Sequence, residues 1–486
     1  MAIGSISFLQ EPQATSNQVP VITNWNPIIP YTVYQDDISG LYYFKLILEV
    51  RLDSVSGTVI AKLKQRRNGY PADISADEAR ATFDLRDIVN SQLEDTIADQ
   101  NDTTKSIHTL GSNVVAKPFS LNNNQVKTIS VIAYQEYSEL VSATPSEESS
   151  PAVNDTRKYI AASLLLEIPR GTADFQNTAF QAFQLDDASG RFLSDIQQSS
   201  VDVLSTSVYR NYVQDTDYHT LGFLNGKATN PATTQEFDSE LRYFYVQYYE
   251  SDGTEINSGV TKRLSNAAAY GGCKPLESDG EIDADNERLV YVGCGPANLE
   301  AQTYDADAKP SNNSGWAYYK VYANDGGGND KSADYYFIKQ DGSCKGFKVR
   351  RLAWRNSLGC YDYFNFKMKS TQSIDVTKND YETVLGNFNS NMYSYDNFGR
   401  GKKTRQTTAL VKETLNTDWI TEQDAQLLEG LIMSTNVEVI ENADTTYTVP
   451  VMVTDKSFVR KTVANDKIKI QYTINIEYAN PLNTNS

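Results

Sequence analysis

Histidine is scarce in this chain: 486 residues contain only His108 and His219. Histidine is the commonest general acid–base group and a frequent metal ligand, so its scarcity argues against the enzyme classes that depend on it. The chain also lacks the glycine-rich phosphate loop of nucleotide-binding proteins and the G-x-S-x-G turn of serine hydrolases. We therefore predict a protein that is not an enzyme, with no catalytic residue and no cofactor.

Cysteine is nearly as rare and is never found in a C-x-x-C pair, which argues against a zinc ribbon or a thioredoxin-type site. Two interpretations are open for the four cysteines. They form two disulfides, or they are buried thiols, which a reducing cytoplasm favours. The residues are Cys273, Cys294, Cys344 and Cys360.

One acidic segment has the alternate spacing of calcium ligands. Ala284 stands where the EF-hand loop requires glycine for its sharp turn, so we predict a solvated loop and no metal site. The carboxylates of this segment are Asp279, Glu281, Asp283, Asp285 and Glu287.

The sequence has no long apolar run, so we expect that the protein does not insert into a membrane. It also has no basic, apolar leader, so we expect synthesis in a cytoplasm. The formal net charge of −18 argues against direct binding of nucleic acid. One short basic stretch interrupts the acidic chain, at Arg400, Lys402, Lys403 and Arg405. We predict an exposed loop there, with contact to a phosphate or a partner as the alternative.

Strand patterns are what the chain has in abundance. Large apolar residues alternate with polar residues over 468–478 and again over 42–52, as expected for β-strands with one wet face. A turn at 53–57 and a second strand over 58–64 predict a hairpin. The sequence therefore predicts a mainly β protein with two to three antiparallel β-sandwich-like domains.

The expected domains are an N-terminal sandwich (1–156), a middle β domain with long loops (157–340) and a C-terminal α+β domain (341–486). The last carries one amphipathic helix, with Thr421 as its N-cap and an apolar face. We expect a loop over 141–156, which is rich in Ser, Glu and Pro, and a strand over 159–168. The apolar face of the helix comprises Ala425, Leu428, Leu431 and Ile432.

One segment combines a tryptophan, a turn and aromatic residues in a recognisable order. It runs from Arg351 to Phe366 and contains W-x-N-x-x-G-x-x-D-x-[FY]-x-F, with Trp354, Asn356, Gly359 and Asp362 at its fixed positions. This pattern resembles virion structural proteins of tailed bacteriophages. Three further stretches resemble those proteins in the type of their residues and in their order along the chain. They lie at 192–194 with 218–224, at 292–299, and at 419–451. The aromatic residues of the hairpin either pack in a core or contact a neighbouring subunit.

The resemblance implies a non-enzymatic structural component of a phage particle, in the tail, baseplate or neck, located in the virion after synthesis in the host. Its partners would be copies of itself in a ring and other virion proteins. The alternative is a carbohydrate-binding or carbohydrate-cleaving host-recognition module at the tail tip. The high content of tyrosine, 31 residues, suits either function.

Overall fold

The computed structural model describes the chain in segments, and every structural statement below concerns these segments. They are residues 4–12, 21–23, 29–66, 77–94, 97–122, 124–162, 184–185, 188, 190–194, 211–225, 241–272, 289–340, 346–384, 386–389, 392–394, 401–420, 422–441, 447–457, 459 and 470–485.

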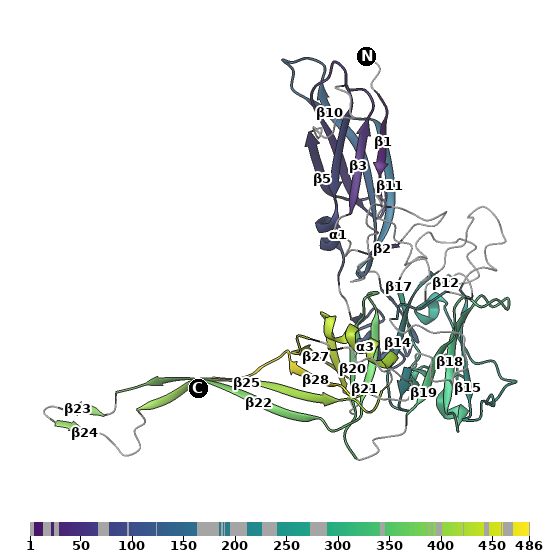
Figure 1. Ribbon diagram of the computed structural model, residues 1–486, viewed down its shortest axis with the longest axis vertical. Helices are drawn as coiled ribbons and strands as arrows, with labels where there is room; N and C mark the ends of the chain where they lie inside the picture. The colour runs from purple at the N-terminus through teal and green to yellow at the C-terminus, as the bar shows by residue number, and fades with distance from the viewer. Residues whose placement is uncertain are drawn as a thin grey trace. The chain divides into compact units, whose positions relative to one another are not determined.

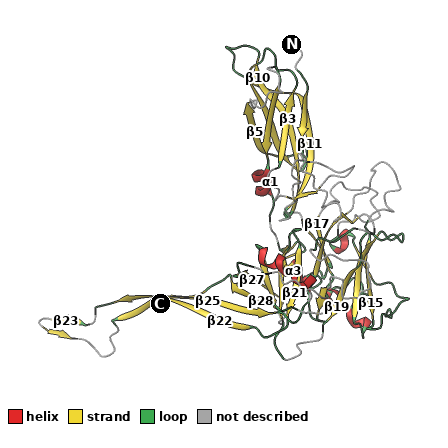
Figure 2. Cartoon of the chain, in the orientation of Figure 1, coloured by secondary structure: helices red, strands yellow, loops and turns green. Residues whose placement is uncertain are grey.

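Contacts divide the chain into two compact units. The first comprises residues 1–208, 215–339 and 356–361, and the second comprises 209–214, 340–355 and 362–486. Strands make up 52% of the structure and helices 9%, which confirms the predicted mainly β class. Figure 2 shows that strands predominate in both units and that the helices are short. The division into three domains remains a prediction.

The N-terminal part of the first unit is a two-layer sandwich (Figure 1). A three-stranded sheet of order β1-β3-β6 packs on a five-stranded sheet of order β2-β11-β10-β4-β5. The bounds are β1 Ile6–Gln10, β2 Val21–Thr23, β3 Pro30–Gln35, β4 Tyr42–Leu52, β5 Val59–Arg66, β6 Ala79–Asp84, β10 Val126–Ser138 and β11 Ser146–Ile160.

The sandwich core is built from alternate residues of both sheets. Leu48 on β4 and Val131 on β10 face Val33 on β3 and Phe83 on β6, and all four are buried. Because side chains alternate across a strand, this arrangement leaves the intervening residues on the outer faces. The predicted hairpin is confirmed, since β4 and β5 pair antiparallel from Lys45 with Arg66 onward. Helix α1, Arg86–Gln92, closes one end with Val89.

Two further sheets of the first unit are joined by aromatic rings. Phe223 of β14 lies 4.7 Å from Phe244 of β15, and Phe192 lies 4.8 Å from Tyr335 of β19. One sheet has the order β12-β14-β17-β9, and the other contains neighbours in the order β19-β18-β15-β16. The bounds are β9 Phe119–Asn122, β12 Gln184–Leu185, β14 Thr220–Asn225, β15 Tyr243–Tyr249, β16 Arg263–Ser265, β17 Leu289–Gly293, β18 Tyr318–Asn324 and β19 Tyr335–Lys339.

Short elements complete this unit. Helix α2, Pro296–Ala301, begins with proline, whose missing N–H costs nothing at that position. The others are the two-stranded pair β7 Ala98–Asp99 with β8 Asp102–Ser106 and the 3-10 turns η1 Ile107–Thr109, η4 Ala268–Tyr270 and η6 Pro310–Asn313.

The second unit is built around one large sheet with a helix on it, and it also contains the separate pair β23-β24 and strand β13. Its strand order is β21-β20-β26-β27-β28-β25-β22, and β29 pairs separately with β25. The bounds are β13 Asn211–Val213, β20 Arg350–Arg355, β21 Tyr361–Phe366, β22 Thr371–Glu382, β23 Asn387–Asn389, β24 Met392–Ser394, β25 Lys402–Asn416, β26 Val437–Glu441, β27 Tyr447–Val453, β28 Thr473–Tyr478 and β29 Leu482–Asn485.

The predicted helix is confirmed as α3, Glu422–Met433. Leu428 and Leu431 are fully buried, Ile432 is half-buried, and the helix lies against β20 of the sheet that also contains β28. The expected N-cap, Thr421, lies outside the described residues. In the predicted C-terminal strand, 468–478, regular pairing covers 473–478 of the described residues, and 468–469 lie outside them.

The loop predicted over 141–156 is confirmed over 141–145 and wrong from Ser146 onward. Residues from Ser146 onward form the long strand β11, which pairs with β10 up to Ile160. The pairing is interrupted between Val153 and Glu148, and Pro151 lies within that interruption, where its missing N–H breaks no ladder bond. The predicted strand over 159–168 is therefore the end of β11, and its part beyond 162 lies outside the described residues.

Candidate interaction surface

A long antiparallel hairpin extends from the sheet of the second unit (Figure 1). Strands β22 and β25 pair from Thr371 with Thr414 to Glu382 with Lys402, and the short strands β23 and β24 lie beyond them. Every residue of β22 is exposed. We call residues 371–416 the arm.

In the described part of the arm, buried side chains occur only near its base, at Glu413 and Leu415. Ile374 is 59% exposed and Val376 is 51% exposed, although they alternate like residues that face a core. Their cross-strand partners are Val411 and Ala409, so the four side chains share one face of the ribbon. This apolar face is available to another surface.

The arm also has an open edge. β25 pairs with β22 on one side, and with β28 and β29 on the other. β22 is the last strand in the order of the sheet, so in the described structure its outer edge pairs with no strand. Such an edge presents N–H and C=O groups to which another strand can add.

The arm differs in charge from the rest of the chain. Residues 371–416 contain six basic and five acidic side chains and carry a net charge of +1, so the other 440 residues carry −19. Lys402, Lys403 and Arg405 are exposed near the far end of β25. The exposure predicted for the basic stretch is confirmed, but the predicted loop is wrong, because these three residues belong to a strand. Arg400 lies outside the described residues.

Local contacts hold some charges of the arm. Lys412 Nζ lies 2.6 Å from a carboxylate oxygen of Asp375, and this bond raises the pKa of Lys412. The hydroxyl of Thr404 donates to Asp380, which is 3.5 Å from Lys402, and the first of these contacts does most to lower the pKa of Asp380. Arg405 is the extra residue of a β-bulge, since Thr404 and Gln406 pair with consecutive residues of β22.

The segment with the phage-like pattern has a structural role. Asn356 Oδ1 accepts the backbone N–H groups of Leu358 and Cys360, both at 3.0 Å, and so closes the turn between β20 and β21. Gly359 adopts φ +89°, and a Cβ there would lie 2.3 Å from the carbonyl oxygen of Ala161. Asparagine and glycine are thus required by the backbone at these two positions.

Hydrogen bonds connect the other similar stretches of the first unit to this turn. The side chain of Asn356 donates to the carbonyl of Leu193, whose N–H donates to Gly222. Asn298 accepts the N–H of His219 at 2.7 Å and donates to the carbonyl groups of His108 and Leu110. Stretches separated by more than 100 residues therefore meet around buried amide side chains.

Both histidines are packed against aromatic rings. His108 lies 4.6 Å from Tyr361, and His219 lies 4.9 Å from Phe337, both edge to face. Each is buried. Trp354 is also fully buried, which favours core packing over a subunit contact for this ring.

The cysteines are resolved in part. Cys294 and Cys360 are buried free thiols, as one of the two interpretations expected, while Cys273 and Cys344 lie outside the described residues. The Sγ atom of Cys360 packs so closely on Gly222 that a Cβ there would lie 2.2 Å away.

The described segments bring no three His, Cys, Asp or Glu side chains together as a metal site would need. The predicted acidic loop, 279–287, lies outside these segments. None of the described helices combines the length and the apolar character that crossing a membrane would require.

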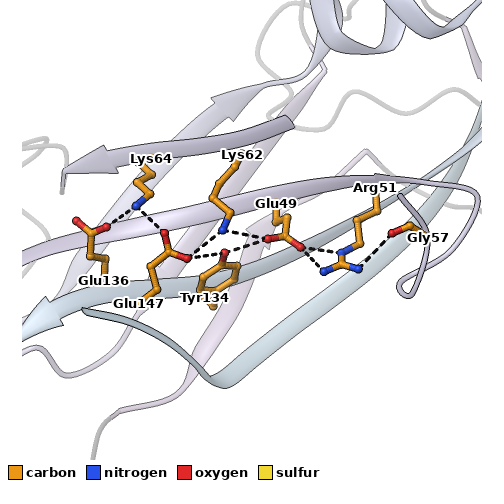
Figure 3. Close-up of polar contacts among 8 residues, drawn as sticks. All are labelled: Glu49, Arg51, Gly57, Lys62, Lys64, Tyr134, Glu136 and Glu147. Atoms are coloured by element: carbon orange, nitrogen blue, oxygen red, sulfur yellow. Dashed lines mark hydrogen bonds and ion pairs between the residues drawn. The ribbon is translucent and has the colours of Figure 1, made fainter. Parts of the chain in front are cut away.

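The outer face of the N-terminal sandwich carries a network of ion pairs (Figure 3). Glu147 of β11 lies 2.9 Å from Lys62 and 2.7 Å from Lys64, both on β5. These two lysines lower the pKa of Glu147 to about 2. Glu136 binds Lys64 and Lys45 at once, and Lys45 contributes most to lowering its pKa.

The same network continues along β4. Burial disfavours ionisation of Glu49, but bonds from Arg51, Tyr134 and Lys62 outweigh it and lower the pKa of this carboxyl group. Arg51 also donates to the carbonyl of Gly57 at 3.2 Å, which fixes the turn of the hairpin. The opposite charges of this network are paired across four strands. The network therefore stabilises the sandwich and leaves little unpaired charge that could bind a ligand.

Known proteins offer no closer identification. No protein-family description matches this chain, and a comparison with curated proteins finds none that is similar to it.

Proposed function

We propose that this chain is a non-enzymatic structural component of a tailed-bacteriophage particle, in its tail, baseplate or neck. Copies of the chain would form a ring and contact other virion proteins. The observation that carries the proposal is the arm, an extended ribbon in which every residue of β22 is exposed. Its apolar residues and its unpaired edge suit an assembly protein that is completed by its neighbours.

The energetics support this role. Fixing the backbone of one residue costs about 1–2 kcal/mol, and a two-stranded hairpin without a core has little burial to offset that cost. Ile374 and Val376 gain less from folding in the isolated chain than core residues do, because more than half of each remains exposed. A neighbour that covers them would supply the missing burial.

The resemblance to phage structural proteins supports the same proposal. Its stretches occur in the expected order, and those of the first unit meet around Asn356 and Asn298 through hydrogen bonds. A shared architecture would require such residues for folding, with no chemistry at that place.

Purified particles provide the test. Wild-type protein should be recovered from particles at a fixed ratio to the other virion proteins, and imaging should place it in a symmetric ring. A variant in which Asn-Gly joins Ser373 to Lys412 removes the arm but keeps the pairing of β25 with β28. It should fold and be missing from particles. Absence of the wild-type protein from particles, or normal incorporation of the shortened variant, would contradict the proposal.

A second candidate is carbohydrate binding, favoured by a tyrosine-rich sheet face. Tyr245 stacks on Tyr322 at 5.4 Å, and Tyr249 stacks on Tyr318 at 5.0 Å, across strands β15 and β18. Lys320 lies on the same sheet, 4.9 Å above the ring of Tyr322. Aromatic faces beside polar groups are suited to the apolar face and the hydroxyl groups of a sugar.

Glycan-array binding separates the two candidates. If this chain is a host-recognition module, it should bind a defined glycan, and the Tyr245→Ala and Tyr322→Ala variants should lose that binding. The arm-shortened protein should bind as the wild type does. Binding that survives both tyrosine substitutions would exclude this face as the sugar site.

A further inference from the structure

The end of the N-terminal sandwich that carries the β3–β4 connection has features complementary to those of the arm. Gln35, the last residue of β3, pairs with Ala79, the first of β6, and Tyr42, the first of β4, pairs with Ser138 at the end of β10. The β10–β11 connection begins there as well. We call residues 36–43, 77–78 and 139–145 the sandwich tip.

Four large apolar side chains are exposed on the sandwich tip. The exposed fractions are 42% for Tyr42, 54% for Tyr43, 64% for Leu140 and 59% for Val141. Tyr43 has φ +58°, a conformation that a bulky residue rarely adopts, and its hydroxyl donates to the carbonyl of Val141 at 3.0 Å. This bond holds an aromatic ring on the surface at the expense of backbone strain, which is typical of a contact site.

Carboxylates surround these apolar residues. Asp36, Asp37 and Glu139 are exposed, and none of them forms an ion pair in the described part of the chain. Asp37 accepts the backbone N–H of Ser39 at 2.9 Å, which keeps its carboxylate in place. The nearby Lys45 is already bound to Glu136. The sandwich tip is therefore an apolar patch with an acidic rim.

The far end of the arm has the opposite arrangement. Val384 is 86% exposed and Met392 is 78% exposed, so this end also presents apolar residues. They are accompanied by the exposed bases Lys403 and Arg405 of β25. The sandwich tip and the far end of the arm both expose apolar residues, and the charged residues beside them have opposite signs. The two surfaces are therefore complementary in hydrophobicity and in charge.

We propose that the far end of the arm binds the sandwich tip of a second copy of this chain, with Lys403 and Arg405 facing Asp37 and Glu139. The inference rests on the proposed function and names the partner of the arm within it. Each copy has one arm and one tip, so the contact is head-to-tail. Such a contact produces a ring when the rotation between copies closes.

The chain's net charge sets the conditions of the test. A net charge of −18 makes copies repel one another at low ionic strength. At about 0.15 M salt the Debye length is about 8 Å, which screens this long-range repulsion and leaves close pairs effective. Association is therefore measured at that ionic strength.

The first experiment is zero-length carbodiimide cross-linking of a 1:1 mixture of unlabelled and ¹⁵N-labelled full-length protein. Mass spectrometry should find Lys403 joined to Asp37 or Glu139 in mixed-isotope peptides. Cross-links found only within one isotope would place the contact inside a single chain, and the lack of any such cross-link up to the solubility limit would exclude it. Either result overturns the inference.

The second experiment exchanges the charges. An arm variant, Lys403→Glu/Arg405→Glu, and a tip variant, Asp37→Lys/Glu139→Lys, should each reduce self-association about tenfold in sedimentation equilibrium. A 1:1 mixture of the two variants should restore it, because every arm then meets a tip of opposite charge. Restoration by mixing also shows that neither variant is merely misfolded.

A matched control is Lys369→Glu/Lys456→Glu, which makes the same change in net charge at exposed lysines outside the far end of the arm. It should associate as the wild type does. If the arm variant loses association and the tip variant keeps it, the arm has another partner and this inference is wrong. Recovery of the wild-type protein from particles would still leave the proposed function standing, so the two failures are distinguishable.

Discussion

The N-terminal sandwich and the arm are built from the same kind of strand pairing and differ in what covers it. β10 pairs with β4 and β11, and its alternate residues Ile129 and Val131 are buried beneath a second sheet. β22 pairs along its whole length with β25, yet its alternate residues Ile374 and Val376 are exposed. Regular strand pairing therefore occurs both where the side chains are buried and where they are largely exposed.

The difference separates stability from assembly within one chain. Apolar residues of the sandwich core are already removed from water when the chain folds, so their contribution is to folding. Exposed apolar residues of the arm, such as Ile374 and Val376, can be fully removed from water only by another surface, so that part of their contribution is to association. The same type of substitution should therefore have different consequences in the two places.

The largest effect is expected from a matched pair of isoleucines. Ile129→Ala in β10 should lower the free energy of unfolding of the sandwich by about 2–5 kcal/mol, because it leaves a cavity in a dry core. Ile374→Ala in β22 should change it by less than about 0.5 kcal/mol, because that side chain is 59% exposed. Urea unfolding followed by circular dichroism measures both.

An equal loss from Ile374→Ala would show that the arm is already covered in the isolated chain. That outcome would contradict the interpretation of the arm as an open surface. The expected result for self-association is the reverse order, with Ile374→Ala the more damaging of the two substitutions.

A second pair of substitutions concerns the turn that the phage-like pattern predicted. Gly359 and Gly315 have nearly the same backbone conformation, φ +89° and +88°, but a Cβ at Gly315 would meet nothing within 4 Å. Gly315→Ala should therefore cost only the conformational strain, about 1–2 kcal/mol. Gly359→Ala adds a collision with the carbonyl oxygen of Ala161 and should cost about 2–4 kcal/mol.

Thermal unfolding of the two variants compares these costs directly. Equal losses would mean that the backbone near Ala161 yields without cost, and that Gly359 is needed only for its conformation. A larger loss at Gly359 supports the view that this pattern specifies the fold of the first unit.

Alternation of apolar and polar residues was sufficient to predict a strand where one face of that strand is buried. The range 42–52 was predicted from an alternation that includes Leu46, Leu48 and Val50, and it has the observed bounds of β4. Burial on one side and water on the other produce a period of two that is visible in composition alone.

The alternation did not predict strands that lack this contrast between a buried and an exposed face. β11 is largely exposed at its start, contains Pro151 and is rich in Ser and Glu, so its composition is that of a loop. β22 is exposed throughout and was not predicted at all. In the arm the exposed basic stretch could be predicted, but its strand, its open edge and its apolar face depend on pairing between residues 20 to 43 positions apart.

The smallest expected effect compares charge pairs in the two regions. Glu136 is bound by two lysines on the sandwich face, whereas Asp375 of the arm has one exposed partner, Lys412. Glu136→Gln should lower the free energy of unfolding at pH 7 by about 1 kcal/mol, and Asp375→Asn should leave it within about 0.5 kcal/mol of the wild type.

The lowered pKa of Glu136 determines how the stability of the sandwich changes with pH. The lysines lower the folded-state pKa of Glu136 below its unfolded value of about 4.3, so its contribution is present above that pH and is lost as the pH falls through the folded pKa. Glu136→Gln should therefore flatten the decline in sandwich stability between about pH 5 and pH 3. Urea titrations across this range measure the slope. Equal slopes for wild type and Glu136→Gln would mean that the lysines stabilise this carboxylate no better than water does, and the sandwich face would then be as weakly coupled as the arm.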